Sequence, residues 1–138
     1  MGYIGWSFIA LAAYGVTTIL LKLALRNIPP EAAAAITNTM LVGSAVVYAV
    51  YRGINIPQQL SQGVSTVYLL LAGVTLSVGI ISFYIALSRG PASVVAPIFG
   101  MNLALVSIMG FILLGEPVNT TRVLGVALAA VAIMLLTR

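Results

Sequence analysis

Five long apolar stretches, separated by short polar segments, dominate the pattern of hydrophobic and polar positions along the chain. A helix needs about 20 mostly apolar residues to cross the hydrocarbon core of a bilayer, and each stretch is close to that length. The sequence therefore predicts an all-α integral membrane protein, built as a five-helix transmembrane bundle. The expected spans are residues 3–25, 31–51, 66–87, 92–114 and 119–137.

Turn-forming residues separate these spans. Pro29 and Pro30 end the first span, because proline cannot continue the hydrogen bonding of a helix. A polar loop over residues 52–65 follows the second span, and a Gly-Pro turn at Gly90 and Pro91 precedes the fourth. Loops this short leave no room for an extramembrane domain, so we expect residues 1–138 to form a single transmembrane domain.

Composition supports a lipid environment and excludes several kinds of site. The chain is 62% hydrophobic and 6% charged, whereas soluble domains are about 25% charged. The basic residues stand singly near the ends of apolar runs, which does not resemble the clustered basic face that binds nucleic acid. With no Cys, no His and only two distant acids, we expect no metal, no cofactor and no enzymatic activity.

An odd number of spans places the two termini on opposite sides of the membrane. The positive-inside rule then compares the basic residues on each side, and the difference is small. It gives a slight preference for an outside N-terminus and permits insertion in both orientations. Arg52 and Arg122 lie on the N-terminal side; Lys22, Arg26, Arg89 and Arg138 lie on the C-terminal side.

Polar side chains inside the spans are the candidates for a binding site. Tyr14, Thr18 and Lys22 follow one another at four-residue spacing, which places them on one helical face. Lys22 lies near the end of its span, so it either extends to the lipid headgroups or lines the mouth of a cavity. Tyr84 belongs to a similar stripe of small and hydroxylated residues in the third span, which serves equally well for helix packing.

The fourth span is the most irregular. Pro97 and Gly100 fall within its first half and predict a bend. Bent or broken helices near the midplane are a feature of transporter binding sites. Asn102 lies near the middle of the span, where an amide needs a partner, and serves either as a contact between helices or as a substrate contact.

The fifth span and the two acids favour structural roles. Gly125, Ala129 and Ala132 form a ridge of small residues in an otherwise apolar helix, which predicts close packing, including packing in a dimer. Glu31 and Glu116 each lie at an expected helix start, where a carboxylate caps amides and complements the helix dipole. We therefore expect both to be structural caps, and no acid remains in mid-span for proton exchange.

Three segments resemble the EamA-type domain of the drug/metabolite transporter superfamily: "YGVTTILLKLALRNIPP", "FYIALSRGPASVVAPI" and "LLGEPVNTTRVLGVALAAVAIMLL". Most members of that superfamily have ten spans in two such domains, so this chain is similar to one half of a ten-span transporter. Members export amino acids, other metabolites or drugs. Four-span small multidrug resistance proteins carry a glutamate in their first span, and this sequence has none there.

Two functions follow as hypotheses. The first is a transporter in the plasma membrane of a prokaryote, an exporter of small metabolites or drug-like solutes that works by alternating access in an antiparallel homodimer. Its small-molecule substrate would contact Tyr14, Thr18, Lys22, Tyr84 and Asn102. The second is an accessory or assembly subunit that transports nothing and partners another membrane protein.

Overall fold

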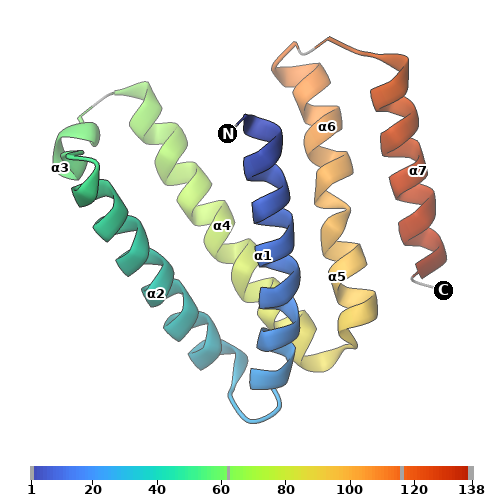
Figure 1. Cartoon of the computed structure of the whole chain (residues 1–138), viewed down its shortest axis with the longest axis horizontal. Coiled ribbons are helices and arrows are strands. Elements are labelled where there is room, and N and C mark those ends of the chain that lie inside the picture. The colour runs from blue at the N-terminus through green and yellow to red at the C-terminus, as the bar shows by residue number, and fades with distance from the viewer. Residues whose placement is uncertain (1, 62, 116, 137–138) are drawn as a thin grey trace. The chain divides into compact units, whose positions relative to one another are not determined.

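The computed structural model describes residues 2–61, 63–115 and 117–136, and every regular element within them is a helix (Figure 1). The all-α membrane fold class predicted from the hydrophobic pattern is thereby confirmed. The helices are α1 (Tyr3–Ala24), α2 (Pro30–Tyr51), α3 (Ile56–Gln59), α4 (Val64–Arg89), α5 (Ala92–Gly100), α6 (Asn102–Leu113) and α7 (Thr120–Leu136).

Four helical segments of the described chain are long and apolar enough to cross a membrane: α1, α2, α4, and α5 together with α6. Only 6% to 11% of the residues in their apolar windows are buried, so their surfaces are suited to lipid or to a partner helix. The fifth, α7, has 17 residues, which at about 1.5 Å per residue span about 25 Å. The chain is therefore a multi-pass membrane protein.

Glycines in the left-handed conformation end two of the helices. Gly53, with φ of 69°, follows α2, and its N–H bonds the carbonyl of Val50 while that of Ile54 bonds the carbonyl of Ala49. These two bonds form a Schellman motif, which satisfies carbonyls at the helix end. Gly115, with φ of 65°, follows the C-cap of α6 in the same way.

The polar loop after α2 contains the short helix α3, which the apolar pattern does not predict. The Asn55 side chain starts it by accepting a hydrogen bond from the Gln58 N–H. A polar side chain at the N-cap is enough to begin one turn of helix without an apolar face.

The chain divides into two compact units. One unit is Leu20–Ser88, which holds the last turn of α1 together with α2, α3 and nearly all of α4. The other comprises the described residues of Met1–Ile19 and Arg89–Arg138, and in it α5, α6 and α7 contact one another. Each unit carries some of the residues expected to contact substrate.

Candidate functional site

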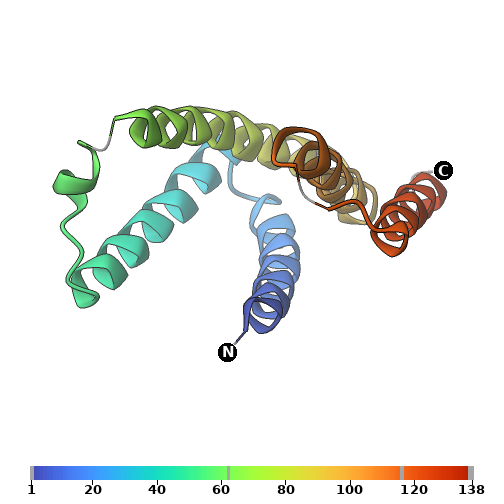
Figure 2. The ribbon, with the colours of Figure 1, turned by 90° about the horizontal axis from the view of Figure 1, so that it is seen from above.

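Three helix ends meet at the one place in the Leu20–Ser88 unit where described residues are buried, which we call the α1–α2–α4 junction. Figures 1 and 2 show α2 approaching α4 at the N-terminal end of α2 and diverging from it toward the α2 C-terminus. Small side chains at the start of α2 let the backbones approach closely there. The buried residues of the junction are Leu21, Ala33, Ala34, Tyr84 and Leu87.

Lys22 connects α1 to α4 at the junction. Its Nζ donates a hydrogen bond to the backbone carbonyl of Leu87, at 2.7 Å. That carbonyl is available because the residue four positions further on is Pro91, which has no N–H to donate. The C-terminal end of a helix also carries partial negative charge, which a lysine ammonium complements. Lys22 is thus a cap for α4, supplied by another helix.

Tyr84 connects α4 to α2 in the same region. Its hydroxyl is hydrogen bonded to Oγ1 of Thr37, and the residue is 8% exposed. Thr37 Oγ1 also lies 2.9 Å from the carbonyl of Ala33, which can only accept. The Thr37 hydroxyl therefore donates to Ala33, and Tyr84 donates to Thr37.

Most hydroxyls in the spans point back to their own helix. Thr18 donates to the carbonyl of Tyr14 at 2.9 Å, and Ser77 donates to that of Gly73 at 2.8 Å. The Asn38 amide does the same with Ala34, at 2.7 Å. This pattern uses the donor and leaves the oxygen of each hydroxyl as an acceptor, so a stripe of such residues offers acceptors rather than donors.

The five residues expected to contact substrate are divided between the two units. Lys22 and Tyr84 lie in the α1–α2–α4 junction, where each has a partner from another helix. Tyr14, which is 72% exposed, Thr18 and Asn102 belong to the other unit. That all five line one cavity stays a prediction. Sequence reasoning gave no role to the Leu87 carbonyl, although Pro91 four residues further on is a signal that this carbonyl has no helical donor.

The fourth span is interrupted about halfway along. Helix α5, which contains Pro97, ends at Gly100, and the N–H of Met101 bonds the carbonyl of Ile98, three residues back, at 3.1 Å. Helix α6 starts afresh, with the carbonyl of Met101 accepting from Ala104 and Leu105, and Asn102 is its first residue. Interrupted backbone at membrane depth is tolerated where it is buried in protein or lines a water-filled cavity.

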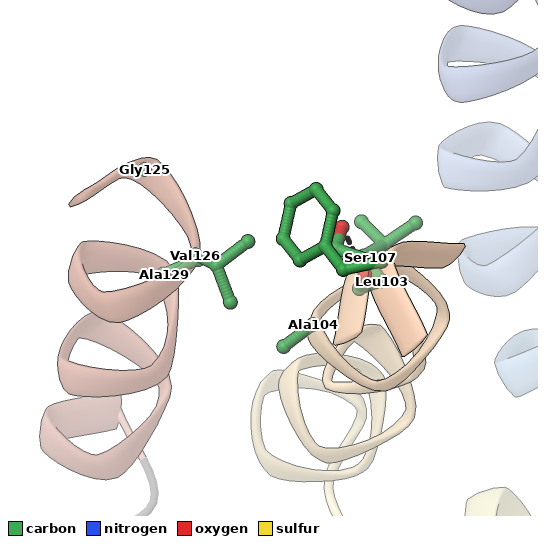
Figure 3. A pocket seen from close by; sticks show the side chains of 7 residues that line it. Leu103, Ala104, Ser107, Gly125, Val126 and Ala129 are labelled. Atoms are coloured by element: carbon green, nitrogen blue, oxygen red, sulfur yellow. Dashed lines mark hydrogen bonds between the residues drawn. The ribbon is translucent and has the colours of Figure 1, made fainter. Parts of the chain in front are cut away.

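A shallow groove of about 410 Å³ lies between α6 and α7. Figure 3 shows Val126 of α7 pointing toward the side of α6 that carries Ser107. Two of the three small residues expected in dimer packing line this groove, so they face α6 of their own chain; Ala132 does not line it. The lining residues are Leu103, Ala104, Ser107, Phe111, Gly125, Val126 and Ala129.

Of the two acids, Glu31 lies within the described residues and Glu116 does not. Glu31 is exposed in the first turn of α2, where its charge complements the helix dipole. The N-cap itself is Pro29, and no side chain makes a capping hydrogen bond there, so Glu31 acts through charge alone. Glu116 lies outside the described residues, and its role as a cap stays a sequence prediction.

Comparison with known proteins identifies the family. The model of the EamA-like transporter family matches residues 1–138. A protein of Sinorhizobium sp described as "Uncharacterized transporter in cobO 3'region" is 27% identical over 133 residues, which cover 95% of this chain and 93% of that protein. No solved structure matches the chain. With a family model matched over its full length, the chain belongs to the EamA-like transporter family.

Proposed function

We propose that this protein exports small metabolites, such as amino acids, or drug-like solutes across the plasma membrane of a prokaryote. Membership of a transporter family supports transport, as does the relative in Sinorhizobium sp that is described as a transporter. The observation that carries the proposal is the interruption at Met101, which divides one span into two helices about halfway along. Discontinuous helices of this kind form the binding sites of many transporters.

The solute binds beside the interruption. Asn102 supplies an exposed amide at the start of α6. Tyr14 and Thr18, in the same unit, add a phenol and a hydroxyl oxygen that accepts. An amide with hydroxyls suits a neutral or zwitterionic solute better than a multiply charged one. Lys22 and Tyr84 belong to the other unit, where each holds α4 to a neighbouring helix.

Two copies of opposite orientation form the transporter. Ten-span relatives join two five-span domains, and an odd span number inverts the second domain relative to the first. A binding site at the interface of such inverted repeats needs both copies. Helix α7 supports pairing because Gly125, Ala129 and Ala132 are all exposed and small. The groove between α6 and α7 is open to a helix of the second copy.

Reconstitution in liposomes tests the proposal. Purified protein is assayed for uptake of a panel of radiolabelled amino acids and fluorescent cationic drugs. The matched pair is Asn102→Leu and Asn27→Leu, which remove the same amide from α6 and from the exposed turn between α1 and α2. Flux that is lost only in Asn102→Leu supports the site. Absence of flux across the whole panel would favour the accessory-subunit hypothesis.

A further inference from the structure

We propose that the α1–α2–α4 junction is one gate of the transport cycle, closed in this structure by Lys22 on Leu87 and by Tyr84 on Thr37. The inference rests on the proposed transport function. It adds the place where the transporter opens to one side of the membrane. Both contacts join different helices, and both lie in the Leu20–Ser88 unit. Away from the junction, α2 and α4 expose large apolar side chains such as Val47 (70%) and Leu70 (61%).

The position of the Lys22–Leu87 contact makes it easy to break and remake. Lys22 lies in the last turn of α1, and Leu87 lies two residues before the end of α4. Near helix ends, water and headgroups are at hand to replace the partner that each group loses. The same contact placed in mid-membrane would leave unsatisfied polar groups on opening, which costs far more.

Opening leaves α2 undisturbed. When Tyr84 withdraws, the Thr37 hydroxyl still donates to Ala33 and the Asn38 amide still donates to Ala34. Of the hydrogen bonds described above, those of the Tyr84 hydroxyl, the Lys22 ammonium and the Leu87 carbonyl change partners. A junction that can separate without breaking the internal bonding of a helix lets the helices move as rigid bodies, as a gate requires.

Opening exposes two alanines at the start of α2. Ala33 is 4% exposed and Ala34 is 8% exposed, whereas Ala32 beside them is exposed. A thiol at either buried position reacts with a water-soluble reagent only when the junction separates. Because the chain has no Cys, a single substitution gives an unambiguous signal.

The test is maleimide labelling of Ala33→Cys in proteoliposomes without any solute, with Ala32→Cys as the exposed reference. We expect the Ala33→Cys thiol to label more slowly than the reference. Adding Lys22→Met or Tyr84→Phe should accelerate it at least tenfold, while Arg26→Met, an exposed cation at the same helix end, should not. Lys22→Arg, which keeps a donor, should preserve the slow rate. Ala34→Cys serves as the second reporter if Ala33→Cys fails to fold.

The outcomes separate the two proposals. A labelling rate that does not respond to Lys22→Met or Tyr84→Phe refutes the gate, even if flux is normal. A response that comes with an equal acceleration at Ala32→Cys shows a structural junction and also refutes it. Labelling that responds while no solute is transported refutes the transport proposal and leaves the opening of the junction in place.

Discussion

The phenol of Tyr84 on α4 is hydrogen bonded to the hydroxyl of Thr37 on α2, which in turn donates a hydrogen bond to the carbonyl of Ala33. The chain of donors runs in one direction because a carbonyl can only accept. Thr37 therefore serves its own helix and a neighbour with a single oxygen. Each of the two side chains has a distinct effect when it is removed.

Tyr84→Phe should lower the free energy of unfolding by about 1 kcal/mol, because it removes one neutral hydrogen bond and keeps the buried ring. Thr37→Val should cost more, about 1 to 3 kcal/mol, since it leaves the buried phenol without its acceptor. Unfolding in mixed detergent micelles measures both. If the double variant loses the sum of the two single losses, the side chains do not interact and this account of the bond is wrong.

Lys22→Met should impair transport while the protein still inserts and folds. The ammonium holds the Leu87 carbonyl, and hydrogen bonds to charged groups contribute about 1.5 to 3 kcal/mol. Flux in liposomes and elution volume in detergent measure the two properties. Lys22→Arg should restore part of the activity, because it keeps a cationic donor. Wild-type flux in the methionine variant would show that the lysine only anchors its helix.

Asn102→Leu should abolish or strongly reduce flux with little change in stability, because the amide is exposed at the start of α6 rather than packed. A direct substrate contact also predicts a raised apparent KM in the milder Asn102→Ser. Equal flux in Asn102→Leu and wild type would move the binding site elsewhere in the chain.

Glu116→Gln should reduce expression or stability modestly and leave any pH dependence of transport intact. The reason is its place between Gly115 and Pro117, at the turn between two spans, where a carboxylate caps a helix start. A pH profile of flux in liposomes checks this. A profile that becomes flat in the variant, at unchanged expression, would make Glu116 the proton-carrying group instead.

Gln58→Cys reports the orientation of the chain, because α3 lies in the loop between two spans. If copies insert both ways to form an antiparallel dimer, about half of this thiol should react with an impermeant reagent from each side of the membrane, since the positive-inside bias is slight. Permeabilised vesicles give the total. Reaction from one side only would exclude the antiparallel dimer.

The apolar runs predicted the fold class because in lipid every spanning segment must satisfy its own backbone, which leaves helices as the simple solution. The residues between the spans also predicted where the helices end, as Pro91 and Gly115 show. The acceptor for Lys22 could not be predicted, because it is a backbone carbonyl 65 residues away. Nor could the partner of Tyr84 be chosen from the many hydroxyls in the spans, since most of them satisfy their donors on their own helices and keep an acceptor free in the same way.

The distance in sequence between Lys22 and Leu87 also sets an order of events during synthesis. The lysine leaves the ribosome 65 residues ahead of its acceptor, which at about 5 to 20 residues per second is an interval of about 3 to 13 seconds. During that interval the ammonium has no Leu87 carbonyl to bond, and lipid headgroups are the polar groups that a lysine at the end of a span reaches. Once the third span is complete, Pro91 leaves a helix-end carbonyl to which the lysine can donate. The newborn helix thus depends first on lipid and then on its own chain.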